Sequence, residues 1–78
     1  MNKESVKRIL ADNVRMLRTK KRFSQEAVAE LANIGQNQIS EIENEHANPS
    51  LETLIRIANA FEVTISDLLT EKIWKIQN

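Results

Sequence analysis

Three consecutive side-chain amides, Gln36, Asn37 and Gln38, occupy the middle of the chain. Each amide both donates and accepts hydrogen bonds, so a row of them is suited to recognising polar edges rather than to moving protons. Ser40 and Glu41 follow within about one helical turn and add a hydroxyl and a carboxylate. The chemistry that this segment offers is therefore directional hydrogen bonding to a partner.

Residues for catalysis or metal binding are scarce. The 78 residues include no cysteine and a single histidine, His46, which excludes thiolate and multi-histidine metal sites. The sequence contains no Ser/His/Asp grouping at a useful spacing and no glycine loop that would cradle a phosphate. An enzyme is therefore the poorest fit, and we expect no catalytic residue, metal, cofactor or small-molecule ligand.

Length and composition indicate one small helical domain. A chain of 78 residues with 41% hydrophobic residues can form a single core over residues 1–78. One glycine, one proline and 4% aromatic residues favour helices joined by short turns over a sheet. No apolar run approaches the ~20 residues of a membrane span, and the charged first residues lack the apolar stretch of a secretory signal. We expect a cytoplasmic protein without membrane contact.

Apolar residues recur with helical periodicity in five segments, which predicts a compact all-α domain of five short helices. The first is expected over about residues 5–20 and the last over about residues 65–76. Their apolar stripes are Val6, Ile9, Leu10, Val14 and Leu17; Ala27, Val28, Leu31 and Ala32; Ile39 and Ile42; Leu51, Leu54, Ile55, Ala58 and Phe61; and Ile65, Leu68, Leu69, Ile73 and Ile76. Ser24, Ser50 and Thr64 are the expected N-caps of the second, fourth and fifth helices.

The turn between the second and third helices is short. Asn33 tolerates the left-handed conformation that ends a helix, and Gly35 can begin the next helix as its N-cap. Ile39 and Ile42 are the only apolar residues of the third helix, about residues 36–44, so they must face the core. The outward face then carries Gln36, Asn37, Ser40, Glu41 and Asn44. Two helices joined by such a turn, the second polar on its exposed side, describe a helix-turn-helix.

The sequence resembles the lambda-repressor-like (Xre-type) DNA-binding domains over about residues 9–69. The resemblance rests on short elements in register: Leu17-Arg18, Ser24-Gln25-Glu26, Val28-Ala29, Ile39-Ser40, Ile42-Glu43, Asn48-Pro49-Ser50 and Leu68-Leu69. It implies a five-helix fold in one domain, with residues 70–78 as a C-terminal extension. Free-standing members of this size include phage repressors and Cro proteins, controllers of restriction–modification systems, and DNA-binding antitoxins.

The resemblance assigns a partner to the polar face of the third helix. It implies that this recognition helix enters the major groove of double-stranded DNA and that base contacts come from the positions of Gln36, Asn37 and Glu41. Ser40 lies on the same face. An amide can bond bidentately to adenine, and a carboxylate can accept a hydrogen bond from cytosine N4. On residue type alone, each of these positions reads instead as a solvated part of a helix.

Phosphate contacts are expected on either side of the recognition helix. Backbone N–H groups at a helix N-terminus bind anions, and Ser24 and Gln25 stand at the start of the second helix. The resemblance implies that Gln25 holds the DNA backbone there. Asn44, His46 and Asn48 match a loop that lies along the phosphates in the family. His46 reads otherwise as a simple surface histidine.

Two positions depart from the family pattern, which often has glycine at each. Asn33 can still adopt the backbone conformation that the corner needs. Glu45, just after the recognition helix, places a negative charge near the expected phosphates and so opposes tight DNA binding.

Arg18 and Glu43 suggest a binding site by residue type, but we expect them to be structural. The resemblance implies a buried ion pair that ties the first helix to the end of the third. Glu43 lies beside Ile39 and Ile42 on the helical wheel, which places it on the core side. Removing one partner of such a pair would leave a buried charge unpaired, at a cost of ~3–5 kcal/mol.

A single recognition helix reads few bases, so we expect a homodimer on two operator half-sites about one helical turn apart. Trp74 falls off the apolar stripe of the last helix and is either a cover for the core or an interface anchor. The second interpretation is preferred, with Phe61, Ile65 and Leu69 as its neighbours in a dimer interface.

The zero net charge hides a strong asymmetry. Residues 1–22 hold eight basic and two acidic residues, whereas the remainder holds three basic and nine acidic ones. This asymmetry indicates either a polyanion partner, attracted partly by Lys20, Lys21 and Arg22, or a solvated helix with a basic end. The preferred function is a sequence-specific DNA-binding transcriptional regulator. The alternative is a protein-interaction module of the same fold, such as an antitoxin-like protein, with weak or no DNA binding.

Overall fold

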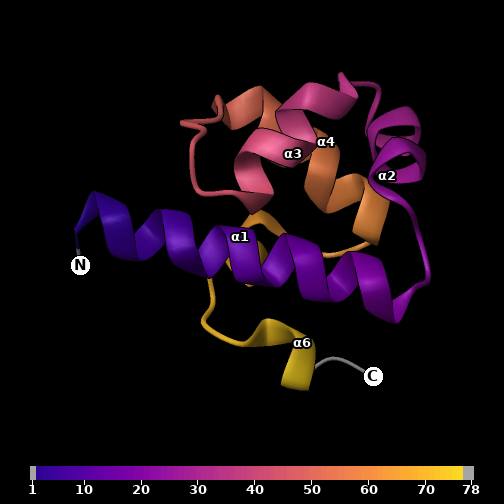
Figure 1. Ribbon diagram of the computed structural model, residues 1–78. Helices are drawn as coiled ribbons and strands as arrows, with labels where there is room; N and C mark the ends of the chain where they lie inside the picture. Colours follow the sequence, from indigo (N-terminus) through magenta and orange to yellow (C-terminus); the bar gives the residue numbers. More distant parts are fainter. Residues whose placement is uncertain (1, 77–78) are drawn as a thin grey trace.

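The computed structural model describes residues 2–76, so residues 1, 77 and 78 of the expected domain and C-terminal extension lie outside the described residues. Within this range the chain is all-α, as predicted, and contains no strand. The helices are α1 (Lys3–Lys20), α2 (Gln25–Ala32), α3 (Gln36–Glu43), α4 (Leu51–Phe61), α5 (Ile65–Leu68) and α6 (Ile73–Ile76). Figure 1 shows their arrangement.

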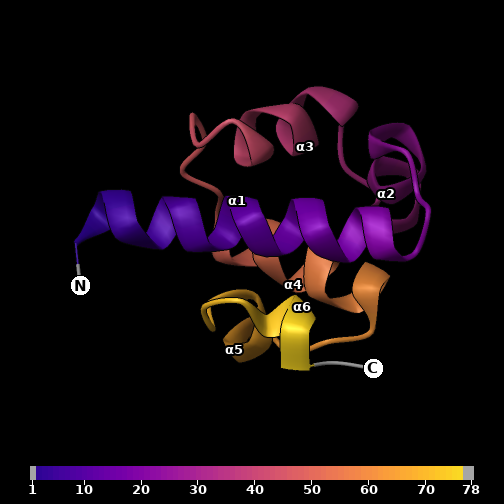
Figure 2. The same ribbon diagram turned by 60° about the horizontal axis from the view of Figure 1, so that its bottom comes forward.

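The long helix α1 packs against α3, α5 and α6, whereas α2 packs against α3 and α4. Helices α2 and α3 lie on one side of it and α5 and α6 on the other, with α4 behind, as Figures 1 and 2 show from two directions. The core between these helices is formed by side chains that are at most 1% exposed: Val14, Val28, Ile39, Ile57, Phe61 and Leu68. Helix α3 is therefore held directly against α1, and α2 is held through α3 and α4.

Capping residues begin and end the helices at the predicted places. Ser24 Oγ accepts a hydrogen bond from the backbone N–H of Ala27 at 3.0 Å, and Ser50 and Thr64 cap α4 and α5 in the same way. Asn33 ends α2 in the left-handed conformation, with φ 57° and ψ 49°. The short corner of the helix-turn-helix thus follows from local sequence, because these side chains satisfy backbone groups that helix ends leave unpaired.

The expectation of one last helix over residues 65–76 is wrong, because the chain forms two short helices there and the described helices number six. The buried side chain of Asn13 explains the break. Its Nδ2 donates to the carbonyl oxygens of Leu68 and Thr70 at 2.8 and 2.7 Å, and its Oδ1 accepts from the N–H of Ile73 at 3.2 Å. The carbonyl of Leu68 thus bonds to α1 rather than to a continuing helix, and the carbonyl of Thr70 accepts both from Asn13 and from the N–H of Ile73. The chain turns through Lys72 at φ 57°.

Four residues expected in the core are exposed instead. Leu31 is 57% exposed on α2, Leu51 and Ile55 are 66% and 43% exposed on α4, and Ile76 is 68% exposed on α6. Helix α4 buries a different arc, which includes Ile57 at 0% exposure. Ile76 leaves the core because α6 starts anew after the break and does not continue the helical phase of α5.

Candidate nucleic-acid interface

Helix α3 has one buried and one open side. Ile39 and Ile42 are 0% and 3% exposed and anchor the helix in the core. Gln36, Asn37 and Glu41 are exposed on the other side. Ser40 is half-buried. The polar face predicted from the sequence is therefore accessible to a partner.

The third amide of the row, Gln38, has a structural role. Its Oε1 accepts a hydrogen bond from the backbone N–H of Gly35 at 3.0 Å, which fixes the first turn of α3. Gly35 itself has an ordinary extended backbone, with φ −75°, so its position does not require glycine for backbone reasons. Gln36 and Asn37, the other two amides, are exposed and remain available to a partner.

A buried brace holds the other end of α3. Arg18 on α1 donates from Nε to Glu43 Oε2 at 2.7 Å and from Nη2 to Oε1 at 3.1 Å. Their side chains are only 17% and 6% exposed. The hydrogen bond to Glu43 raises the pKa of Arg18 further above its ordinary value, so the guanidinium stays charged. Such bidentate geometry fixes both the distance and the orientation between α1 and α3.

The brace includes two groups that sequence reasoning missed. Arg18 Nη1 donates to the carbonyl oxygen of Phe23 at 3.0 Å. Gln25 Nε2, at the first turn of α2, donates to Glu43 Oε1 at 3.2 Å. The brace therefore joins α1, α2 and α3. The sequence spacing of Gln25 and Glu43 does not predict this contact, because the contact depends on the angle that the turn at residues 33–35 sets between α2 and α3.

The residues expected near phosphates lie at two separate places. Ser24 is engaged as the cap of α2, and Gln25 beside it is bound to Glu43. Asn44, His46 and Asn48 are exposed in and beside the loop that follows α3. The first place is the start of α2, and the second is the loop that follows the end of α3.

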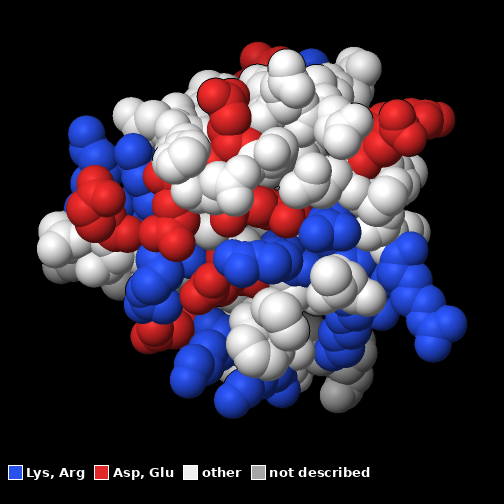
Figure 3. Space-filling model, viewed as in Figure 1, with Lys and Arg blue, Asp and Glu red and all other residues white. Residues whose placement is uncertain are grey.

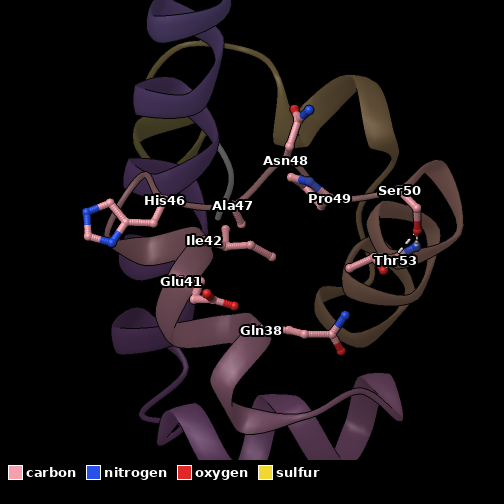
Figure 4. Close-up of a pocket in the computed structure, with 9 residues that line it drawn as sticks. All are labelled: Gln38, Glu41, Ile42, His46, Ala47, Asn48, Pro49, Ser50 and Thr53. Atoms are coloured by element: carbon pink, nitrogen blue, oxygen red, sulfur yellow. Dashed lines mark hydrogen bonds between the residues drawn. The ribbon is translucent and has the colours of Figure 1, made fainter.

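A hollow of about 390 Å³ lies between α3 and the start of α4. Its lining consists of Gln38, Glu41 and Ile42 from α3, residues 46–49, and Ser50 and Thr53. Figure 4 shows the side chains of Gln38 and Glu41 directed toward this hollow and the imidazole of His46 directed away from it. Glu41 thus lies at the rim of the hollow as well as on the open face of α3.

Charge is unevenly distributed over the molecule. Figure 3 shows Lys and Arg side chains mainly along α1 and around α6, whereas the surface over α2 and α3 is mostly uncharged with a few acidic groups. The open face of α3 therefore offers hydrogen bonds more than positive charge. Glu45, just beyond it, is exposed and has a left-handed backbone with φ 63°.

Comparison with known proteins identifies the family. The family model described as HTH_3, helix-turn-helix, matches residues 14–68, which is well over half of the chain. The chain belongs to the HTH_3 family. Within this family it is similar to the control protein C.SmaI of Serratia marcescens, with 37% identity over 67 residues that span 86% of this chain and 80% of that protein.

Solved structures agree with this assignment. A hypothetical transcription factor, NHTF, from Neisseria superposes with a TM-score of 0.84 and 25% identity, covering 97% of this chain and 87% of that one. The restriction–modification controller protein C.AhdI from Aeromonas hydrophila superposes with a TM-score of 0.76 and 27% identity, covering 80% and 94%. The predicted resemblance to lambda-repressor-like domains is confirmed at the level of the family, whose members are DNA-binding transcriptional regulators and not enzymes.

The four residues expected in a dimer interface lie in different surroundings within this HTH_3 fold. The prediction of Phe61 as an interface residue is wrong, because its side chain is 1% exposed in the core and leaves no surface for a second chain to contact. Ile65, Leu69 and Trp74 are half-buried and pack against the core. The ring of Trp74 also has Lys75 Nζ 5.4 Å from its centroid.

None of the helices within residues 2–76 is both long and apolar enough to cross a bilayer.

Proposed function

We propose that this HTH_3 protein binds operator DNA sequence-specifically by inserting α3 into the major groove. One observation carries the proposal: the polar side of α3 is open, while Ile39, Ile42 and the Arg18–Glu43 brace fix the helix from behind. A recognition helix must be rigid, because base-edge hydrogen bonds require correct distances and angles. Its N-terminal residues approach the bases most closely in helix-turn-helix proteins.

Gln36 and Asn37 are the proposed principal base readers. Both are exposed in the first turn of α3, and each amide can bond bidentately to adenine N6 and N7. Ser40 and Glu41 lie one turn further along the same face and serve as secondary contacts. Glu41 would accept from cytosine N4.

Phosphate contacts are proposed at the start of α2 and in the loop after α3. Ser24 and Gln25 present the backbone N–H groups of the α2 N-terminus. The amide nitrogen of Gln25 carries two hydrogens, one of which bonds to Glu43, so the second can serve a phosphate oxygen. Asn44, His46 and Asn48 are the proposed contacts on the other side.

The proposed active form is a homodimer that places two copies of α3 in successive major grooves, one helical turn or ~34 Å apart. One short helix contacts too few bases to distinguish an operator from other DNA. A two-fold dimer doubles the number of contacted bases, because each copy contributes the same helix. We further propose a cytoplasmic repressor or controller role for the single domain of residues 1–78.

Mutation of the open face tests this assignment. Gln36→Ala and Asn37→Ala should each weaken binding to a selected operator by ~1–3 kcal/mol and relax base preference at one position, with unchanged thermal unfolding. The operator comes from selecting bound duplexes out of a random pool, and binding is measured by fluorescence anisotropy. The matched control is Glu62→Ala, an exposed position at the end of α4. Full discrimination by both amide variants would refute the assignment.

A second function, a protein-interaction module without DNA binding, is favoured by the scarcity of Lys and Arg side chains on the surface over α3 (Figure 3). Phosphate neutralisation supplies much of the affinity for DNA, so a DNA-binding protein should hold random duplex at low salt and release it as salt rises. Titration at two salt concentrations separates the two functions. Absence of binding at low salt would favour the interaction module.

A further inference from the structure

An apolar groove of about 300 Å³ lies beside the first turns of α1. Its apolar walls come from α1, from the loop before α4, from α4 itself and from the residue after α5: Val6, Leu10, Pro49, Leu54 and Leu69. Small-molecule sites in proteins have volumes of about 300–1,000 Å³, so the groove is large enough for one small ligand. The sequence alone predicts no such ligand, because the lining residues come from three distant parts of the chain.

Two lysines supply the charge of this lining. Lys3 and Lys7 lie one turn apart on α1 and therefore on the same face of the helix. Lys3 is exposed, and Lys7 is half-buried. Within the described residues 2–76 neither ammonium group forms an ion pair with a carboxylate, whereas Arg8 and Arg18 on the same helix both do. The groove therefore offers two positive charges to an anion.

The charge and the apolar surface occupy different ends of the groove. Long side chains in a helix point back toward its N-terminus, so the two ammonium groups lie toward the start of α1. Leu10, one turn beyond Lys7, is only 5% exposed, and Leu69 is partly buried against the core. The dipole of α1 also favours negative charge near its N-terminus. The groove therefore fits a molecule with an anionic head and an apolar tail.

We propose that this groove binds a free single-chain amphiphile with an anionic headgroup, such as a medium-chain carboxylate. The headgroup lies between the amines of Lys3 and Lys7, and the chain packs along Val6 toward Leu10 and Leu69. A small polar anion would leave the apolar walls without a contact, and an uncharged apolar molecule would leave both amines unpaired. The inference goes beyond the proposed function and does not depend on DNA binding.

Two hollows elsewhere on the molecule have the opposite charge. The hollow beside α3 has the carboxylate of Glu41 at its rim, and the hollow against Leu31 on α2 is also lined by Glu30. A carboxylate in the lining repels an anionic headgroup, whereas Asn48, the third polar residue of the groove, is uncharged. The combination of amines and apolar walls therefore distinguishes the groove from these two hollows.

Titration of the isotope-labelled full chain with octanoate and decanoate, each below its micelle-forming concentration, tests the site by NMR. The amide shifts should saturate at one molecule per chain and should be largest at Val6, Lys7 and Leu10. Decanoate should bind about fivefold to tenfold more tightly than octanoate, because each buried methylene strengthens binding by up to about fourfold. Acetate has the same headgroup without the tail and should give no saturable shift. Absence of saturable shifts with decanoate would overturn the proposal.

Substitution of the two lysines tests the position of the headgroup. Lys3→Gln/Lys7→Gln should weaken decanoate binding by about tenfold or more, because it removes both charges that face the carboxylate. Its thermal unfolding should be unchanged, since neither amine is ion-paired in the fold. The matched control Lys72→Gln/Lys75→Gln removes the same charge from exposed positions outside the groove and should bind decanoate like the unmodified chain. Equal losses in both variants would indicate unspecific charge attraction and would overturn the site.

Two other occupants of the groove are separated by the same lysine variant. Vesicles of phosphatidylglycerol present anionic heads and acyl chains in a bilayer, and a second copy of the chain presents carboxylates on a protein surface. We expect neither vesicle co-sedimentation nor self-association to depend on Lys3 and Lys7. A dependence of either on these lysines, without saturable decanoate binding, would overturn the proposal in favour of that occupant. All these measurements are made without DNA, so their outcome is independent of the proposed function.

Discussion

Two buried polar clamps hold α1 to the rest of the molecule, and they differ in kind. The brace near the end of α1 is ionic and joins Arg18, Gln25 and Glu43. The clamp in the middle of α1 is neutral and consists of Asn13 with three backbone groups of residues 68–73. The first fixes the helix-turn-helix, and the second fixes the turn between α5 and α6.

The difference between them indicates what each region must do. A bidentate ion pair fixes orientation as well as distance, which suits a helix that must read bases. A single amide that satisfies backbone groups suits a segment that must only remain attached. Loss of one partner should lower the stability more at the ionic clamp, because it leaves a buried charge unpaired. Loss of the amide leaves only neutral polar groups without their side-chain partner.

Removing one half of the ionic brace should have the largest effect. We expect Glu43→Ala to lower the free energy of unfolding by about 3–5 kcal/mol, because Arg18 would remain buried without its carboxylate. Urea denaturation followed by circular dichroism measures this loss. The double variant Arg18→Met/Glu43→Leu is the control, and it should recover most of the stability because no charge remains buried. Equal losses in both variants would show that packing, not charge, holds this site.

Removing the neutral clamp should cost less and act locally. We expect Asn13→Ala to lower the free energy of unfolding by about 1–3 kcal/mol, because the carbonyl of Leu68 loses its side-chain donor while the carbonyl of Thr70 and the N–H of Ile73 keep only their bond to each other. Trp74 is the only tryptophan and lies on α6, so its fluorescence reports this region separately. Its transition should precede the loss of helical signal in the variant. Coincident transitions would mean that residues 70–76 are not a separable unit.

The same two regions show what the sequence could and could not predict. Capping residues and apolar spacing located the helix-turn-helix, because Ser24, Asn33 and the pair Ile39/Ile42 act through neighbours in the sequence. The family pattern supplied the ion pair of Arg18 and Glu43. The break at residues 69–72 escaped prediction, because its cause is a residue 55 positions or more earlier in the chain.

The buried arc of α4 was mispredicted for a related reason. Periodicity shows that a helix has an apolar side, but it does not show which part of that side is buried. Leu51 and Ile55 belong to the same apolar stripe as Leu54 and Ala58. Which part of a wide apolar side faces the core depends on the placement of α2 and α5, the helices that pack against α4. Similarly, the exposure of Gln36 and Asn37 was predictable from residue type, but the binding of Gln25 to Glu43 was not.

Each region also contains a residue other than glycine in the left-handed conformation, Glu45 after α3 and Lys72 before α6. Because glycine adopts this conformation without a steric penalty, we expect Glu45→Gly and Lys72→Gly each to raise the free energy of unfolding by about 0.5–1 kcal/mol. Only Glu45→Gly should also strengthen DNA binding at low salt, since it removes a carboxylate beside the recognition helix. Equal effects of the two variants on DNA binding would contradict the proposed position of the phosphates.

The smallest effect is expected from the exposed ion pair that parallels the neutral clamp, in which Arg8 Nη2 donates to Glu71 Oε1 at 2.8 Å. The hydrogen bond from Arg8, with its positive charge, lowers the pKa of Glu71. A carboxyl with a lowered pKa in the folded state stabilises the fold above its unfolded pKa, and this contribution disappears as the pH falls through the folded pKa. Arg8→Gln should therefore flatten the acid side of the stability profile slightly, and only at low salt, because both side chains are solvated. A change that persists in high salt would mean that Arg8 acts through packing on residues 69–72 instead.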